Sequence, residues 1–201
     1  TLLEKVKLAT ILGTFQSTLI NFKYVSAMWK NNCEEERLLG VSLTGIMDNE
    51  LTNGKSGDTA KLLDELREEA VKVNKEYANK IGVPVAAAIT CVKPSGTVSQ
   101  LVDAASGIHA RHNPFYIRTV RGDKKDPLTK MMVDAGFPVE DDVMNPNHTS
   151  VFSFPMKVHK SAVFRTDMSA IEQLELWLTY QKHWCEHKPS VTISVKEHEW
   201  L

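Results

Sequence analysis

The sequence predicts an α/β fold. Amphipathic helical patterns alternate along its 201 residues with short apolar runs that have the character of buried strands. The clearest pair is a helix over residues 59–81, ended by the segment Gly82–Pro84, and the almost continuously apolar run 85–92. Helices that alternate with buried strands indicate a sheet or barrel built from right-handed crossovers. We find no linker and no internal repeat, so residues 1–201 are treated as one unit.

The first half of the chain is expected to begin with a helix over residues 1–19, where apolar residues recur every three or four positions. No N-terminal signal precedes this helix, and the chain starts at Thr1 instead of Met, so we expect a piece of a longer protein. The next elements are a loop or helix start over 31–36, a buried strand over 37–46, and a turn over 53–57 that makes Asp58 the N-cap of helix 59–81.

The second half follows the same alternation. Alternating apolar residues predict strands, and Pro127 in a first helical turn predicts the start of a helix at Asp126. The expected elements after strand 85–92 are a short helix over 98–102, a strand over 115–120, a helix over 126–135 with Gly136 as its C-cap, a strand over 151–158, a helix over 169–184 and a last strand over 190–195.

The composition excludes several classes of function. The 24 Lys and Arg residues balance 25 Asp and Glu residues, which gives no electrostatic basis for binding nucleic acid or an anionic membrane. The longest apolar run, over residues 83–92, is broken by Pro84 and is too short to span a membrane. Three dispersed Cys residues and the absence of a leader sequence favour a reducing, cytoplasmic location.

The strongest candidate for a functional site is the segment Pro94-Ser95-Gly96-Thr97, which follows the predicted strand 85–92. Gly96 allows backbone N–H groups to approach an anion, and the two hydroxyls and the start of a helix add donors and partial positive charge. Ligands of open α/β sheets bind beyond the carboxyl ends of strands, where this loop falls. The pattern therefore indicates phosphate binding, with an ordinary capped strand-to-helix turn as the alternative.

A second candidate is the run His183-Trp184-Cys185-Glu186-His187, which contains three possible metal ligands. His183 and His187 could share a helix face, but Cys185 would point elsewhere, and Pro189 ends the helix. We therefore expect a polar helix end and assign no metal ligand.

A third candidate is a basic series that follows Gly107-Ile108-His109. Its members are Arg111, His112, Arg118 and Arg121. These side chains could supply positive charge to a nucleotide pocket, because the guanidinium fork matches phosphate. The interpretation we favour is a surface series paired with Asp or Glu.

Four blocks of the sequence resemble one known family, the adenosylcobalamin-dependent (class II) ribonucleotide reductases, and are most similar to its ribonucleoside-triphosphate reductase branch. The blocks keep the order of that family and cover most of the chain. They are Arg37–Asn49, Cys91–Arg121, the motifs Asp126-Pro127-Leu128 and Ala135-Gly136-Phe137-Pro138 taken together, and Ser169–Val195.

The resemblance implies a ten-stranded α/β barrel of which this chain is the C-terminal part, with the N-terminal part and the extreme C-terminal tail outside it. It implies that Pro94, Ser95, Gly96 and Thr97 hold the phosphates of a ribonucleoside triphosphate or diphosphate. It also implies adenosylcobalamin as the radical source, and thioredoxin or a similar dithiol as the reductant that serves formation of the 2′-deoxyribonucleotide.

The chain departs from that family in its cysteines. The family's Asn-Pro-Cys-x-Glu motif, which carries the radical Cys and its carboxylate, and its C-terminal Cys pair are absent. None of Cys33, Cys91 and Cys185 matches these positions, so we assign no catalytic residue and expect the 201-residue chain to be inactive alone. The alternative is a nucleotide-binding or regulatory module without radical chemistry.

Overall fold

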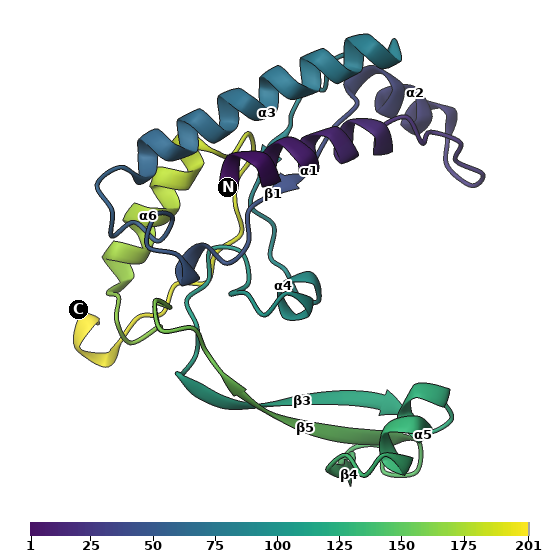
Figure 1. The fold of residues 1–201 in the computed structure, drawn as a ribbon, viewed down its shortest axis with the longest axis vertical. Helices are drawn as coiled ribbons and strands as arrows, with labels where there is room; N and C mark the ends of the chain where they lie inside the picture. The colour runs from purple at the N-terminus through teal and green to yellow at the C-terminus, as the bar shows by residue number, and fades with distance from the viewer. Residues whose placement is uncertain (201) are drawn as a thin grey trace. The chain divides into compact units, whose positions relative to one another are not determined.

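A computed structural model describes residues 1–200 and has an α/β fold that forms two compact units (Figure 1). The first unit comprises Thr1–Arg111 and Ser161–Leu201, and the second comprises His112–Lys160. Each unit contains a sheet of its own, one of two strands and one of three. The two units are described separately below.

Helices α1 (Leu2–Gln16) and α3 (Thr59–Ile81) pack side by side in the first unit (Figure 1). Helix α1 begins with a capping box, since the Thr1 hydroxyl accepts the Glu4 N–H and the Glu4 carboxylate accepts a hydrogen bond from the Thr1 amino group. We expected no capping residues at the start of this helix, and that expectation was wrong. Buried between the helices, the Asn74 amide donates to the Thr14 hydroxyl at 3.0 Å.

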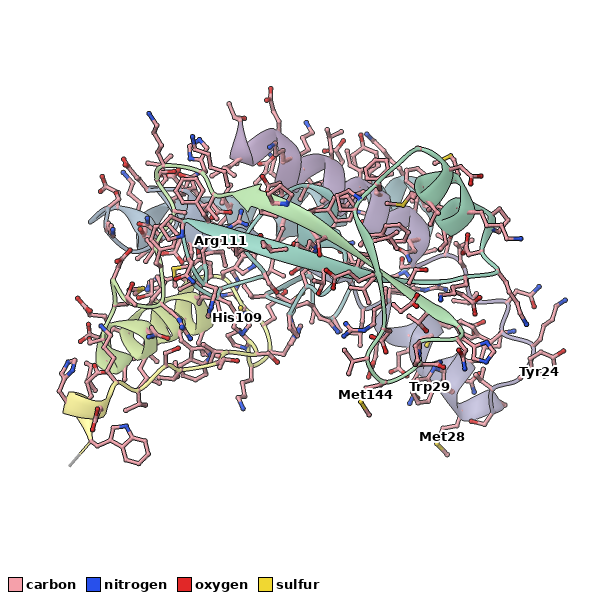
Figure 2. All side chains as sticks on the ribbon, turned by 90° about the horizontal axis from the view of Figure 1, so that it is seen from below. Tyr24, Met28, Trp29, His109, Arg111 and Met144 are labelled. Atoms are coloured by element: carbon pink, nitrogen blue, oxygen red, sulfur yellow. The ribbon has the colours of Figure 1, made fainter. Side chains whose placement is uncertain are left out.

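Helix α2 (Ala27–Glu36) is longer than the loop or helix start expected over residues 31–36. Ser26 caps its N-terminus, and Arg37 ends it in the left-handed conformation, with φ of 45°. The helix buries no residue, and Tyr24, Met28 and Trp29 are exposed at and before its start (Figure 2). The apolar side chains of α2 are therefore not packed into the core of this unit.

The centre of the first unit is a parallel pair of short strands, β1 (Val41–Ser42) and β2 (Thr90–Cys91), joined through η1 (Ile46–Asp48) and α3. Both strands are much shorter than the predicted ranges 37–46 and 85–92. The reason lies before β2, where the Ala86 N–H donates to the Asn74 side chain and the Ala87 N–H donates to the Glu36 carbonyl. These hydrogen bonds replace the ladder of a longer strand.

The hydrophobic core of the first unit lies between α3, the strand pair and helix α6 (Ala170–His183). Its fully buried side chains include Leu63, Tyr180 and Trp184. Ser169 and Glu172 form a capping box at the start of α6, close to the predicted start at Ser169. The short helix α4 (Val98–Leu101) follows β2, as predicted.

The C-terminal segment 190–195 is not a strand, so this prediction was wrong. The Ser194 N–H donates to the Gln173 side-chain oxygen, and the Gln173 amide donates to the Ser194 carbonyl. The segment thus pairs its backbone with a side chain of α6 instead of a strand. A 3₁₀ turn, η2 (Glu197–Glu199), follows it.

The second unit is a three-stranded antiparallel sheet with strand order β3-β5-β4. Strands β3 (Phe115–Asp123) and β5 (Thr149–Lys157) confirm the predictions over 115–120 and 151–158. Helix α5 (Pro127–Asp134) starts after the cap Asp126, as predicted, whereas β4 (Val139–Asp141) was not predicted. The described residues thus form an α/β fold with two small sheets, and the ten-stranded barrel is taken up below as a proposal.

We expect Leu63→Ala to lower the free energy of unfolding by about 2–5 kcal/mol, because Leu63 is 0% exposed and its truncation leaves a cavity between α3 and its neighbours. Leu8→Ala is the matched control, since Leu8 is 61% exposed on α1 and its loss should change stability by less than about 0.5 kcal/mol. Urea unfolding measures both variants. Equal losses would contradict the assignment of Leu63 to the core.

Candidate functional site

The candidate loop leaves the carboxyl end of β2, a strand whose two edges are both occupied. Strand β1 pairs with one edge. On the other, the Glu186 carboxylate accepts N–H groups from Ile89 and Thr90, and the Trp184 indole N–H donates to the Cys91 carbonyl at 2.7 Å. The start of the loop is therefore fixed from both sides.

Ser95 organises the turn of the loop. Its N–H donates to the Ser106 hydroxyl at 2.9 Å, and its own hydroxyl accepts the Ser99 N–H at 2.7 Å. The Ser99 hydroxyl donates back to the Ser95 carbonyl at 2.8 Å. This reciprocal pair closes one turn of backbone over Pro94–Ser99 and leaves the Ser95 hydroxyl hydrogen available to a further acceptor.

The next three backbone N–H groups are open. Within residues 1–200, the amides of Gly96, Thr97 and Val98 have no hydrogen-bond partner, and neither does the Thr97 hydroxyl. Gly96 and Thr97 are exposed, and a Cβ placed on Gly96 would meet no atom within 4 Å. Consecutive amides without protein partners, in residues exposed to solvent, are donors that an anion with several oxygen atoms can use.

Helix α4 contributes less to this site than the sequence suggested. It has only four residues, so its dipole cannot supply the partial charge expected of a full helix N-terminus. Thr97 occupies the N-cap position but makes no side-chain capping hydrogen bond. The open donors at this position are therefore the amides and hydroxyls of the loop itself.

A polar network supports the loop from the segment Asp103–Arg111. The Arg111 guanidinium makes a bidentate pair with Asp48 at 2.9 Å and 2.9 Å, and it also donates to the Asp103 carbonyl at 2.8 Å. Asp48 further accepts the Ala105 N–H at 2.6 Å. Because the Arg111 side chain is 7% exposed, this pair is a buried structural contact. Figure 2 labels Arg111 and the neighbouring His109.

The acidic pairing expected for the basic series is present at two positions, but the surface location is confirmed only at Arg121, since Arg111 is buried. Arg111 pairs with Asp48, and Arg121 in the second unit donates to Asp142 at 2.8 Å. The Arg121 guanidinium hydrogen-bonds Asp142 and holds the pKa of that carboxyl below its usual range. His112 and Arg118 also belong to the second unit.

The side chains of the run from His183 to His187 lie in different environments. The His183 ring lies 3.0 Å from the Asp64 carboxylate, Cys185 is buried, and Glu186 binds the edge of β2. In the described part of the chain, no group of three or more His, Cys, Asp or Glu side chains is arranged to hold a metal ion. Burial, with a smaller contribution from Cys91, raises the pKa of the Cys185 thiol to about 12.

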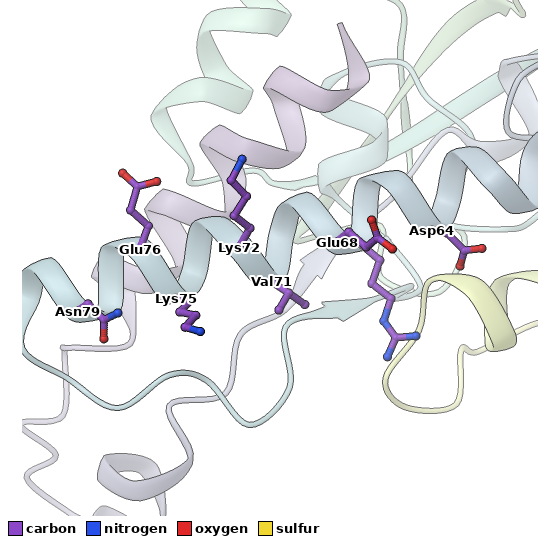
Figure 3. A pocket seen from close by; sticks show the side chains of 8 residues that line it. Asp64, Glu68, Val71, Lys72, Lys75, Glu76 and Asn79 are labelled. Carbon is purple, nitrogen blue, oxygen red and sulfur yellow. The ribbon is translucent and has the colours of Figure 1, made fainter.

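The hollows of the surface lie outside the Pro94–Thr97 loop. One groove of about 670 Å³ runs along the outer face of α3, where side chains of both charges alternate around Val71 (Figure 3). A second, of about 720 Å³, lies between the end of α1 and α2 and reaches Lys93, next to the loop. A third, of about 560 Å³, belongs to the second unit. None of these three grooves is lined by a residue of the Pro94–Thr97 loop.

Several supporting residues were not predicted. Thr44, Asp48, Ser106 and Glu186 fix the loop or its strand, yet no local pattern distinguishes them from ordinary polar residues. All four lie inside blocks that resemble the reductases, which is the one signal that could have indicated them.

Comparison with known proteins begins with the fold. A crystal structure of a B12-dependent (class II) ribonucleotide reductase matches 94% of this chain and 30% of its own chain, with a TM-score of 0.77 and 24% identity. No family model matches the sequence. The fold of residues 1–200 is therefore that of a region of a class II ribonucleotide reductase.

Curated sequences give the nearer relationship. A probable adenosylcobalamin-dependent ribonucleoside-triphosphate reductase of Dictyostelium discoideum is 32% identical over 164 residues, covering 79% of this chain and 21% of its own length. The corresponding reductases of Euglena gracilis and Lactobacillus leichmannii are 27% and 26% identical, over 90% and 83% of this chain. The chain is a homologue of the adenosylcobalamin-dependent ribonucleoside-triphosphate reductases, and it spans about a quarter of their length (26%).

We expect Asp48→Asn to lower the free energy of unfolding by about 3 kcal/mol, because it leaves the Arg111 guanidinium buried without its anionic partner. Asp103→Asn is the matched control. The Asp103 carboxylate lies 3.5 Å from Arg111 but is 58% exposed, so its loss should cost less than about 1 kcal/mol. Chemical denaturation compares the two, and equal effects would refute the structural role of the Asp48 pair.

At about pH 8.5 we expect iodoacetamide to alkylate Cys33 well before Cys185, because the thiolate is the reactive form and burial keeps the pKa of Cys185 high. Peptide mass spectrometry of native protein over a time course gives both rates. Unfolding in urea should remove the difference, and faster labelling of Cys185 in the native chain would contradict its burial.

Proposed function

We propose that this chain supplies the substrate-phosphate loop of an adenosylcobalamin-dependent ribonucleoside-triphosphate reductase, through Pro94, Ser95, Gly96 and Thr97. One observation carries the proposal: three consecutive open amides and two available hydroxyls lie where the relationship to these reductases implies phosphate binding. The reaction of the complete enzyme converts a ribonucleoside triphosphate and a dithiol into the 2′-deoxyribonucleotide, a disulfide and water.

The substrate assignment follows the chemistry of the loop. A polyphosphate chain offers several oxygen acceptors in a row. The N–H and O–H groups from Ser95 to Val98 are a row of donors, which is the complementary arrangement. The names of the relatives specify a triphosphate, which we adopt in preference to a diphosphate.

The radical chemistry is assigned to other parts of the enzyme. Cys91 and Cys185 are buried and Cys33 is half-buried, and no motif places any of them as the radical Cys or in a redox pair. We propose that the chain acts as the C-terminal part of a ten-stranded barrel, is inactive alone, and functions with the N-terminal part and with thioredoxin or a similar dithiol. A cytoplasmic location stays a prediction. No helix of residues 1–200 is long and apolar enough to cross a membrane.

Adenosylcobalamin is proposed as the cofactor of the complete enzyme and supplies its radical. The hollows of the described surface, about 560 to 720 Å³, have the size of ordinary small-ligand pockets. Nothing in the lining of these three grooves identifies a contact to cobalamin. We therefore assign no residue of this chain to the cofactor.

The phosphate loop can be tested by titrating the ¹⁵N-labelled chain with inorganic tripolyphosphate. The amide signals of Gly96, Thr97 and Val98 should shift most. Ser95→Ala combined with Thr97→Ala should weaken binding at least tenfold, since hydrogen bonds to charged groups contribute about 1.5–3 kcal/mol each. Thr97→Ala alone removes a hydroxyl that has no protein partner, so the stability of the chain should not change. Weaker binding by this variant then reports a lost contact to the anion and not a loss of folding.

Ser190→Ala combined with Thr192→Ala is the matched control, because these exposed residues have the same spacing outside the loop. Unchanged affinity in the loop variants, or shifts centred elsewhere, would reject the phosphate role. Ribonucleotide turnover by a complete enzyme that contains this sequence separates the reductase from a nucleotide-binding module without radical chemistry.

A further inference from the structure

We propose that Ser106 is a positioning residue for the phosphate loop, a role that rests on the function proposed above. Its hydroxyl accepts the Ser95 N–H at 2.9 Å. This contact occupies the first amide of the loop, whereas the next three amides, from Gly96 to Val98, have no partner within residues 1–200.

Ser106 can act in this way because both of its neighbours are fixed to the segment that follows β1. The Ala105 carbonyl accepts the Gly45 N–H at 2.7 Å, and the Ala105 N–H donates to Asp48 at 2.6 Å. On the other side, the Gly107 N–H donates to the Thr44 hydroxyl at 3.0 Å. The position of the Ser106 hydroxyl is therefore set by contacts that do not involve the loop.

The close approach of Gly107 to the start of the loop supports the same role. Gly107 has φ of +51°, and a Cβ there would lie 2.9 Å from the Lys93 carbonyl oxygen. Two backbone segments thus meet at van der Waals distance directly before Pro94, which only glycine allows. This contact brings Ser106 within hydrogen-bond reach of Ser95.

The backbone carbonyl of Ser106 is occupied separately from its hydroxyl. It accepts the His109 N–H at 2.9 Å, and the His109 ring nitrogen Nδ1 lies 2.9 Å from the same oxygen. Removal of the Ser106 hydroxyl leaves these bonds in place. Because Ser106 is half-buried, its truncation also opens no cavity in the core. A loss of loop order without a loss of stability is therefore the signature of positioning.

The experiment compares Ser106→Ala with Ser106→Thr, which keeps the hydroxyl, in the full 201-residue chain. Ser56→Ala is the control, because the Ser56 hydroxyl also accepts a backbone N–H, from Asp58, but lies in the turn before α3. Each variant is measured for tripolyphosphate affinity, for ¹⁵N order parameters of the amides from Gly96 to Val98, and for its midpoint of thermal unfolding.

We expect Ser106→Ala to weaken tripolyphosphate binding about three- to tenfold, the effect of one neutral hydrogen bond. It should lower the order parameters of the loop while the unfolding midpoint stays near that of the unchanged chain. Ser106→Thr should restore affinity to within about twofold, and Ser56→Ala should change neither quantity.

Two outcomes would overturn the proposal, and they differ. If the unchanged chain binds tripolyphosphate through the loop and Ser106→Ala binds equally well, Ser106 does not position the loop while the phosphate role stands. If the unchanged chain shows no loop-centred binding, the phosphate role fails and the positioning role fails with it.

Discussion

The structure depends on the requirement that the buried backbone of β2 be fully hydrogen-bonded. Thr90 and Cys91 are both 0% exposed, so an unpaired N–H or C=O there would be costly. Strand β1 satisfies one edge, and the segment Trp184–Glu186 satisfies the other, with the Glu186 N–H donating to the Thr90 carbonyl at 3.1 Å. Two residues of strand thus connect the start, middle and end of the first unit.

The same constraint places the Pro94–Thr97 loop, for which we propose phosphate binding. Because β2 is fixed on both edges, its carboxyl end has a defined direction, and the chain leaves it at Lys93 with the N–H bound to the Ser42 hydroxyl at 3.0 Å. The order continues as far as Ser95 and then stops at three amides without protein partners. A loop that is fixed up to its donors loses little conformational freedom when it binds a ligand.

Local sequence determined what could be predicted. Helix α3, its glycine C-cap at Gly82 and the Pro94–Thr97 loop follow from periodicity and turn residues, because each depends on neighbours in the chain. The lengths of β1 and β2 could not be predicted, since they depend on partners far away in sequence. Glu186 lies 96 residues from Thr90, and Asp48 lies 63 residues from Arg111. No single-sequence pattern records such pairs.

The pairing of Arg111 bears on the phosphate recognition that we propose for this loop. A basic series after a phosphate-like motif suggests guanidinium forks, but Asp48 already neutralises Arg111 within the scaffold. The donors of the loop that have no protein partner are neutral amides and hydroxyls. Their hydrogen bonds depend on the geometry of the acceptor more than on its charge. Selectivity then depends on the orientation of the backbone from Gly96 to Val98. In the proposed role the buried ion pair contributes indirectly, because Asp48 also accepts the Ala105 N–H and so holds the backbone next to Ser106, whose hydroxyl accepts the Ser95 N–H.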